Sequence, residues 1–342
     1  MEFTDYTKPF LQKRNWRMRK MTKFVIFNLS FLIICFLTFT SCNRNQNSEP
    51  EDTPTSGKIN ITADETFKPI VDSEITVFES IYKYASIKVS YKPEEKAFED
   101  LLNDSARIII VTRELTVAEK KHFEDLKLFP HMTKIAYDAV ALLTNNNNPD
   151  SLFTDDQVKK IITGEIISWN QLNPKSPKTP IQIVFDNKNS GTLRYLKEYA
   201  GNNNLSKNSF AADSSNAVID YVSKNKNAIG VIGVTWVGDR NDSTLMTFNN
   251  KVRVAEISPP DSSDGRGSYY KPYQAYIAIR YYPLWRTVYI ISREARTGLG
   301  TGFASFVAGD KGQRIILKSG LVPASMPVRL VELRKQNFHI TN

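Results

Sequence analysis

Short apolar runs alternate with amphipathic helical patterns along most of this chain, and this alternation constrains the possible folds more than any other feature. The run "RIIIVT" at residues 107–112 is dominated by β-branched residues, which is typical of a strand that is buried on both faces of a sheet. From Phe67 onward, apolar residues recur at spacings of three and four, which predicts a helix. Strand and helix patterns that repeat in this order predict an α/β fold with parallel sheets and right-handed crossovers.

The individual elements can be placed by residue number. We expect strands at residues 58–63, 86–91, 107–112, 134–144, 181–185, 228–234, 273–279 and 287–292. We expect helices that begin near residues 67, 97, 116, 154, 193 and 217, and a final helix over residues 303–318. Thr154 and Gln157 match a capping box, and Gly164 matches a helix stop. The segment "GLGTGF" at residues 298–303 is interpreted as a hinge or turn, because it lacks the last glycine of a dinucleotide-binding loop.

The N-terminal segment has the features of a bacterial secretion signal. Several Lys and Arg residues precede an apolar run over residues 24–39, which is shorter than the about 20 residues of a membrane-spanning helix. Small residues follow, and the sequence "FTSC" resembles a lipobox. We therefore predict that residues 1–42 are a signal peptide with a lipobox, that Cys42 is acylated, and that the chain is a membrane-anchored lipoprotein of the periplasm. A plain signal anchor is the alternative interpretation.

The segment after the signal differs in composition from the rest of the chain. Residues 43–57 are polar, contain proline and lack apolar side chains, so we predict a flexible tether. About 285 residues follow, which is more than one small core accommodates and agrees with two lobes.

Composition excludes several classes of function. Residues 1–41 carry seven Lys and Arg and two Asp and Glu, so 38 basic and 34 acidic residues remain after them, and the charge gives no support for nucleic-acid binding. The only cysteines are Cys35 and Cys42, so the mature chain has no pair for a disulfide and no thiol-based metal site. The histidines lack metal-ligand spacing, and no nucleophile–base pair is visible. We therefore predict a protein without cofactor, metal or enzymatic activity.

Ser190, Gly191 and Thr192 lie between a predicted strand and a predicted helix. The first N–H groups of a helix have no partner within the helix and carry the positive end of its dipole, so they form an anion site. Glycine allows the backbone to approach a ligand closely, and the two hydroxyls add neutral donors. An ordinary N-cap is the alternative, since serine and threonine are favoured at that position in any case.

Longer segments around this motif resemble a known family. The sequence "LFTDDQVKKIITGEIISWNQL" followed by "IQIVFDNKNSGTLRYLKEY" is similar to the middle of the periplasmic phosphate-binding proteins of phosphate ABC transporters. The sequence "FASFVAGDKGQRIILKSGLVP" resembles the closing helix of that family. The matching positions in these segments are Ile162, Gly164, Trp169, Asn170, Gly312, Gln313, Gly320 and Pro323. The resemblance covers nearly all of residues 58–325.

The resemblance implies a two-lobed periplasmic binding protein of type II, in which each lobe is a mixed, mostly parallel sheet flanked by helices and the ligand cleft lies between the lobes. Residues 58–135 together with 280–342 would form the first lobe, and residues 136–279 the second. The resemblance also implies capture of inorganic phosphate or a related oxyanion, delivery to an ABC permease, and a monomeric state. A lipoprotein of the same fold that binds a different solute, or that serves as a sensor or scaffold, is the alternative.

The ligand-binding residues implied by the resemblance lie at three loop–helix starts. They are Thr66, Phe67, Thr112, Arg113, Ser190, Gly191 and Thr192. An arginine suits an anion site, because its guanidinium offers several donors and stays charged at any relevant pH. A solvated arginine ahead of a helix is the alternative interpretation of Arg113.

Acidic residues set this chain apart from the family pattern. Asp64 and Glu65 follow the first predicted strand, and Asp186 stands where the family often has an anion-binding arginine. Several carboxylates close to a dianion would repel it, unless they point to solvent. We therefore expect Asp186 to face away and phosphate to bind more weakly than is usual for the family. Arg113 and the helix start at Ser190 are the expected compensating groups, together with Arg194 if its side chain turns towards the cleft. The alternative is that Asp186 lines the site and that the ligand is a cationic or zwitterionic solute.

Overall fold

The computed structural model describes residues 51–201, 204–237, 250–261 and 263–328. The predicted signal peptide, the predicted lipidation site Cys42 and the first part of the predicted tether lie outside these ranges. None of the helices within them combines the length and the apolar composition that a membrane span requires.

Ten strands of the described residues form one mixed sheet, in which the order is β2–β1–β3–β11–β4–β8–β6–β7 and in which β9 and β12 also pair with β4. β5 and β10 form a separate parallel pair. The strands are β1 (Ser56–Asp64), β2 (Tyr84–Lys92), β3 (Ile108–Val111), β4 (His131–Thr144), β5 (Leu152–Thr154), β6 (Gln182–Phe185), β7 (Ser209–Ala211), β8 (Ala228–Gly233), β9 (Arg253–Val254), β10 (Glu256–Ser258), β11 (Trp285–Ser292) and β12 (Val322–Pro323).

Helices follow most of the strands, as the alternating pattern predicted. The α-helices are α2 (Lys68–Ile81), α3 (Glu94–Leu102), α4 (Val117–Asp125), α5 (Asp155–Thr163), α6 (Trp169–Leu172), α7 (Gly191–Tyr199), α8 (Ser215–Lys224), α9 (Gln274–Ala278), α10 (Leu299–Ala308) and α11 (Asp310–Lys318). Two short 3₁₀ helices are η1 (Glu65–Phe67) and η2 (Val234–Trp236).

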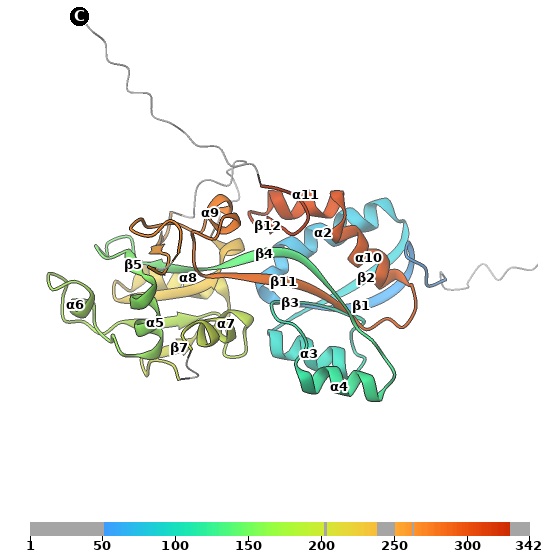
Figure 1. Ribbon diagram of the computed structural model, residues 1–342, viewed down its shortest axis with the longest axis horizontal. Coiled ribbons are helices and arrows are strands. Elements are labelled where there is room, and N and C mark those ends of the chain that lie inside the picture. The colour runs from blue at the N-terminus through green and yellow to red at the C-terminus, as the bar shows by residue number, and fades with distance from the viewer. Residues whose placement is uncertain (1–50, 202–203, 238–249, 262, 329–342) are drawn as a thin grey trace, which may run out of the picture. The chain divides into compact units, whose positions relative to one another are not determined.

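The long strand β4 connects two groups of elements. Within each group the first strands run parallel, namely β1 with β2 and β3, and β6 with β7 and β8. Residues 131–139 of β4 pair with β11 and residues 140–144 pair with β8, both antiparallel. Figure 1 shows β4 and β11 running from the group with α2, α3, α10 and α11 to the group with α5, α7 and α8. The hydrogen-bonded path is continuous through β4, so the groups share a strand, and the lobe boundaries near residues 135 and 280 stay a prediction.

The start and the end of α5 agree with the sequence pattern. Thr154 Oγ1 accepts a hydrogen bond from the Gln157 N–H at 3.1 Å, and Gln157 Oε1 accepts one from the Thr154 N–H at 2.9 Å. Gly164 ends the helix in the left-handed region, with φ at 83°, where glycine avoids the strain that a side chain would introduce. The predicted capping box and helix stop are therefore confirmed.

One predicted strand is wrong, because residues 273–279 form the helix α9. The sequence "YQAYIAI" alternates, but it also places apolar residues at spacings of three and four, and so short a run fits either period. Tertiary contacts select the helix. Ile277 is fully buried, and the Gln274 amide donates a hydrogen bond to the Leu317 carbonyl at 3.0 Å.

The predicted final helix is also corrected, since it consists of α10 and α11 with Gly309 between them. Gly309 has an extended backbone, and α11 then packs closely on the end of α10. A Cβ at Gly312 would lie 2.4 Å from Val307 Cα, which only glycine avoids. The segment "GLGTGF", expected to be a hinge or turn, instead caps and begins α10, with Gly298 at the N-cap.

The last residues of the predicted tether contact α10. The Asp52 carboxylate accepts a hydrogen bond from the Leu299 N–H at 2.9 Å at the start of that helix, where the helix dipole favours a negative charge. Pro54 packs so closely that a Cβ at Gly302 would lie 1.8 Å from its carbonyl oxygen. These contacts join residues 52–54 to α10, whereas residues 43–50 lie outside the described ranges.

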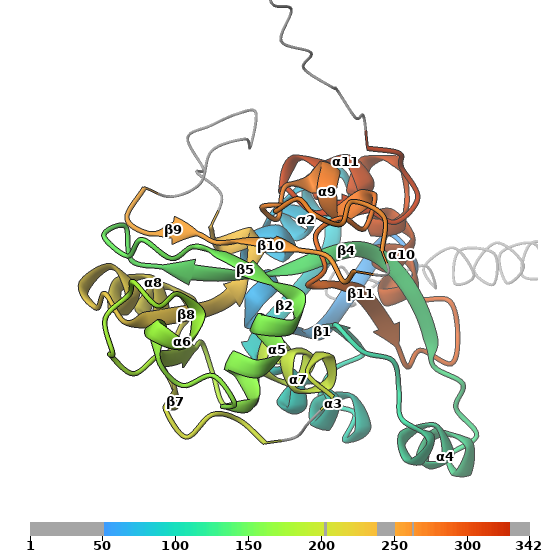
Figure 2. The same ribbon diagram turned by 60° about the vertical axis from the view of Figure 1, so that its left-hand side comes forward.

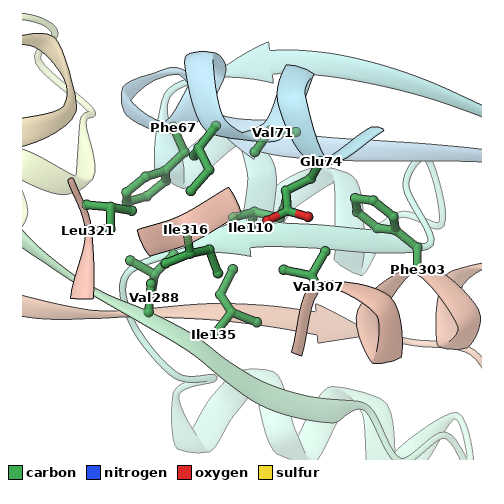
Figure 3. Close-up of a pocket in the computed structure, with 12 residues that line it drawn as sticks. Phe67, Val71, Glu74, Ile110, Ile135, Val288, Phe303, Val307, Ile316 and Leu321 are labelled. Atoms are coloured by element: carbon green, nitrogen blue, oxygen red, sulfur yellow. The ribbon is translucent and has the colours of Figure 1, made fainter. Parts of the chain in front are cut away.

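A buried acid lies in the core between α2 and the sheet. Glu74 is 2% exposed and contributes to a small pocket that is otherwise lined by apolar side chains such as Phe67, Ile110 and Phe303 (Figure 3). Neither of its carboxylate oxygens has a hydrogen-bond partner among the described residues. Burial raises the pKa of Glu74 to about 9, so the side chain is a neutral acid at pH 7.

We expect Glu74→Gln to remove a pH-dependent loss of stability. The native state binds this proton more tightly than the unfolded chain, so the contribution of Glu74 to stability is fully present below about pH 4.5 and is lost as the pH rises towards 9. At pH 7 the loss approaches about 3 kcal/mol. The free energy of unfolding of Glu74→Gln, measured with urea, should therefore rise relative to wild type between about pH 5 and about pH 8. The exposed Glu95→Gln is the control, and a pH-independent difference for Glu74→Gln would contradict the neutral acid.

Candidate functional site

Three loop–helix starts converge on one buried group of polar side chains. Asp64 ends β1, Thr112 directly follows β3, and Ser190 is the N-cap of α7. The Gly191 N–H donates a hydrogen bond to Asp64 Oδ2 at 3.2 Å. Arg194 Nη2 donates to Thr112 Oγ1 at 2.8 Å. These contacts bring the carboxyl end of β1 and β3 to the start of α7, and Figure 2 shows α7 beside α3.

We refer to this group as the polar cluster. Its members are Asp64, Glu65, Thr66, Glu94, Thr112, Asp138, Asp186, Ser190, Gly191, Thr192, Arg194 and Arg286.

Asp64 joins η1 to the start of α7. Its Oδ1 accepts a hydrogen bond from the Thr66 N–H at 2.9 Å, and its Oδ2 accepts the one from Gly191. Burial and the nearby Glu94 raise the pKa of Asp64 to about 6, although Arg286 acts in the opposite direction. The Asp64 carboxylate therefore binds the helix N–H group at which the sequence predicted an oxyanion.

Glu94, the first residue of α3, binds the second set of predicted donors. The N–H and the Oγ1 of Thr112 each donate to Glu94 Oε1 at 2.6 Å, and Arg194 Nε donates to Glu94 Oε2 at 2.5 Å. Burial alone would raise the pKa of Glu94, but Arg194 and Thr112 hold it below its ordinary value. The Glu94 carboxylate is therefore ionised at neutral pH and paired with Arg194.

Arg286 and Asp138 form a buried ion pair across β11 and β4, where the two residues lie opposite each other. Arg286 Nε donates to Asp138 Oδ2 at 2.8 Å, and Nη2 lies 2.8 Å from the same oxygen. Their side chains are 2% and 0% exposed. Burial raises the pKa of Asp138, although Arg286 opposes that rise. The pair places a cation in the interior, next to the acids of the polar cluster.

Asp186 is fully buried, so the expectation that it faces away from the site is wrong. It directly follows the buried end of β6, where the chain turns into the loop before α7 and leaves the side chain inside. Burial raises the pKa of Asp186. Burial raises the pKa of the neighbouring Glu65 to about 7, and the charges of Asp186 and Asp64 add to this rise. These acids therefore line the site, as the alternative interpretation of the sequence stated.

Several atoms of the polar cluster have no hydrogen-bond partner within the described ranges. They are Glu65 Oε1, Asp138 Oδ1, Asp186 Oδ2, Thr192 Oγ1 and Arg286 Nη1. Roughly nine in ten or more of the buried polar groups in proteins are hydrogen bonded. Donors and acceptors that gather in one place without a partner in the chain are the groups that bind a ligand or water.

Most of the predicted site residues lie in the polar cluster, but they differ in their hydrogen bonds and burial. Ser190 Oγ accepts a hydrogen bond from the Leu193 N–H at 3.2 Å, so this hydroxyl acts as an ordinary N-cap. Phe67 is fully buried and faces the apolar pocket of Figure 3, with its ring centroid 5.5 Å from the Arg286 guanidinium. Thr192 contributes a hydroxyl that has no partner among the described residues, and the Thr66 side chain interacts with Asp64.

Arg113 is bonded outside the polar cluster. Its guanidinium donates to both carboxylate oxygens of Glu119, at 2.7 and 2.8 Å, and lies 3.3 Å from the centre of the Phe98 ring. Glu119 is in turn fixed by the capping box of α4. A role of Arg113 in ligand binding stays a prediction, and it requires the guanidinium to leave Glu119.

Sequence reasoning missed Glu94, Asp138 and Arg286. Asp138 and Arg286 are single charged residues within the apolar runs of β4 and β11, and an isolated charge in a buried strand is the signal that could have identified the pair. Glu94 lies in the segment "YKPEEKAF" beside Glu95, which is exposed, and no sequence pattern distinguishes these two acids. Within the described ranges, no group of His, Cys, Asp and Glu side chains is arranged to hold a metal ion.

We expect the Asp138–Arg286 pair to behave as a coupled unit. Asp138→Asn or Arg286→Met alone should lower the free energy of unfolding by about 3–5 kcal/mol, because each leaves a buried charge without its partner. The double variant should lose clearly less than the sum, as measured by urea unfolding in a double-mutant cycle. The half-exposed pair Lys68–Asp72 is the control and should show a coupling of less than about 1 kcal/mol. Additive losses at Asp138 and Arg286 would refute the coupling.

Comparisons with known proteins agree with this architecture. A family model described as the PBP superfamily domain matches residues 48–311. A phosphate-binding protein PstS from Staphylococcus saprophyticus is 26% identical over 262 residues, which cover 75% of this chain and 77% of the relative. Its printed name describes a binding protein and not an enzyme.

Solved structures show the same fold. One is a Clostridium perfringens protein that holds bound phosphate and is described as a phosphate ABC transporter substrate-binding protein. It has a TM-score of 0.65 and 24% identity, and the match covers 78% of this chain and 99% of that one. Another is an ABC-type phosphate transport receptor from Vibrio cholerae, with a TM-score of 0.59, 19% identity and coverage of 79% and 100%. At these identities the likeness shows the fold alone, and it confirms the predicted fold class.

Proposed function

The chain belongs to the PBP superfamily, and from this membership we propose that it is a lipid-anchored solute-binding protein that captures inorganic phosphate or a related oxyanion and delivers it to an ABC permease. We propose that it acts as a monomer in the periplasm, held at the membrane by the acylated Cys42. The relatives named as phosphate-binding proteins support the choice of ligand.

One observation carries this proposal, namely that donors from three loop–helix starts already bind carboxylate oxygens. The N–H groups of Thr66, Thr112 and Gly191 all donate to oxygens of Asp64 or Glu94. Groups that bind a carboxylate oxygen suit the oxygens of another oxyanion, because both accept charge-assisted hydrogen bonds. The start of α7 adds the positive end of a helix dipole.

The acids of the polar cluster support a second candidate, a protein of the same fold that binds a different solute or acts as a sensor. Asp64, Glu65 and Asp186 outnumber the arginines that face them, and repulsion by several carboxylates weakens the binding of a dianion. A cationic or zwitterionic solute would be attracted instead. Phosphate remains the first candidate, because the raised pKa values of these acids allow them to accept the proton of hydrogen phosphate or to become neutral.

We expect phosphate to bind more tightly than sulfate, because sulfate has no proton to donate to a carboxylate of the polar cluster. Thr192→Val should weaken phosphate binding at least about tenfold, since it removes a buried hydroxyl that has no partner among the described residues. Isothermal titration of the full chain in detergent measures both effects. Thr144→Val is the matched control, because Thr144 is also buried, its hydroxyl likewise has no partner in the described ranges, and it lies in β4 outside the polar cluster.

The same titration tests the remaining site assignment. Loss of affinity in Arg113→Ala would support the prediction that Arg113 leaves Glu119 to bind the ligand, and wild-type affinity would remove Arg113 from the site. If wild type binds no phosphate at millimolar concentration but binds a cationic or zwitterionic solute, the second candidate function replaces the first.

We expect Cys42→Ala to prevent lipid anchoring. The residue ends the predicted lipobox, and acylation of its thiol requires the cysteine. The variant should either appear in the soluble fraction or keep its signal peptide, as followed by membrane fractionation and by labelling with a fatty-acid analogue. Undiminished labelling of Cys42→Ala would contradict the lipoprotein assignment.

A further inference from the structure

The donors proposed to bind the oxyanion are already bonded to the chain itself. The Thr112 N–H and hydroxyl both point at one oxygen of Glu94, at 2.6 Å each. Arg194 Nε binds the other oxygen of the same carboxylate at 2.5 Å. Two oxygens of one anion that are held by a backbone N–H, a hydroxyl and a guanidinium are the arrangement in which proteins hold oxyanions.

The Asp64 carboxylate occupies the neighbouring donors in the same way. One of its oxygens binds the Thr66 N–H at 2.9 Å, and the other binds the Gly191 N–H at 3.2 Å. The two carboxylates are packed around Gly191, since a Cβ there would lie 2.7 Å from Asp64 Oδ2, 2.9 Å from Thr112 Oγ1 and 3.0 Å from Glu94 Cδ. An oxyanion cannot reach these donors while both carboxylates remain in place.

We propose that Glu94 and Asp64 are tethered competitors of the ligand, which must displace the Glu94 carboxylate from Thr112 and Arg194 before an oxyanion can bind. The inference rests on the proposed function, because it concerns the same site. Glu94 therefore contributes to specificity. A ligand can replace the Glu94 carboxylate only if it binds the site with a more favourable free energy than that carboxylate does.

The unpartnered atoms of the polar cluster indicate which class of ligand meets that requirement. Thr192 Oγ1 and Arg286 Nη1 have no hydrogen-bond partner among the described residues, so neither carboxylate uses them. A tetrahedral oxyanion carries oxygens in more directions than a planar carboxylate and can bind these donors as well as those that Glu94 gives up. A monocarboxylate such as acetate offers the site nothing that Glu94 lacks. The site therefore favours tetrahedral oxyanions over monocarboxylates.

Glu94 can leave without disrupting its partners. Arg194 stays oriented, because its Nη1 also donates to Glu198 at 2.7 Å and its Nη2 donates to Thr112 Oγ1 at 2.8 Å. Glu94 is the first residue of α3. Rotation of its side chain leaves the backbone hydrogen bonds of that helix unchanged.

The chain offers a matched control for Glu94. Glu294 is also buried, and its carboxylate accepts hydrogen bonds from the Thr301 N–H at 2.6 Å and from Thr301 Oγ1 at 2.7 Å at the start of α10. This is the same pair of donor types on a carboxylate of the same kind, outside the polar cluster. Glu294→Gln should change stability but not the affinity for phosphate.

The test compares phosphate binding by wild type, Glu94→Ala, Glu94→Gln and Glu294→Gln, with the full chain in detergent and radiolabelled phosphate in equilibrium dialysis. Glu94→Ala should bind phosphate at least about tenfold more tightly than wild type, because the competitor is absent, and Glu94→Gln should also bind it more tightly, because its competitor has lost the charge. Circular dichroism checks the fold of each variant. If the Glu94 variants do not fold, Asp64→Asn, which weakens the second competitor, should tighten binding in the same direction.

Acetate supplies an independent readout. In Glu94→Ala, acetate can take the position of the missing carboxylate, so it should inhibit phosphate binding there, whereas equal acetate should have no effect on wild type. Phosphate affinity in the Glu94 variants that equals or falls below wild type would overturn this inference and leave the proposed function standing. Absence of phosphate binding in wild type and in every variant would overturn both, whereas binding by the Glu94 variants alone would support competition by Glu94 but overturn phosphate as the ligand of the wild-type protein.

Discussion

While it is buried, the Glu94 carboxylate holds together the segments that form the site. Burying an ionised carboxylate costs on the order of several kcal/mol of folding free energy, unless hydrogen bonds and a counter-charge compensate it. Thr112 and Arg194 provide both. They come from the end of β3 and from α7, so these segments must stay together for as long as Glu94 stays buried. The same requirement brings the predicted anion donors within reach of one another.

A second buried charge pair explains how a cation comes to lie beside so many acids. Arg286 and Asp138 sit opposite each other on β11 and β4, the strands that run between the two groups of elements in Figure 1. Each compensates the charge of the other, and Nη1 of Arg286 has no hydrogen-bond partner among the described residues. Its field also lowers the pKa of Asp64, against the rise that burial causes. The ion pair thus stabilises the strand crossing and supplies positive potential where Asp186 replaces the expected arginine.

The sequence predicted those features that depend on neighbouring residues and missed those that depend on distant ones. The buried run of β3 and the capping box of α5 follow from local pattern, as does the order of strands and helices. The α9 helix depends on the contact of Gln274 with Leu317 in α11, which no local pattern contains. In the site, Thr66, Thr112 and Gly191 were placed by resemblance to a family. Glu94 and Arg286 find their partners 100 and 148 residues away, so their pairing required the fold.

The expectation that Asp186 faces away from the site was wrong, and the cause is physical. Charged residues usually stay at the surface, but the acids here obtain N–H donors or arginines inside the protein. The central claim is that the chain's own carboxylates hold the donors that an oxyanion needs. Crystal structures of the protein with and without phosphate test it most directly. The account predicts a phosphate oxygen at the Thr112 N–H and a displaced Glu94, whereas bound phosphate with Glu94 still 2.6 Å from that N–H would contradict it.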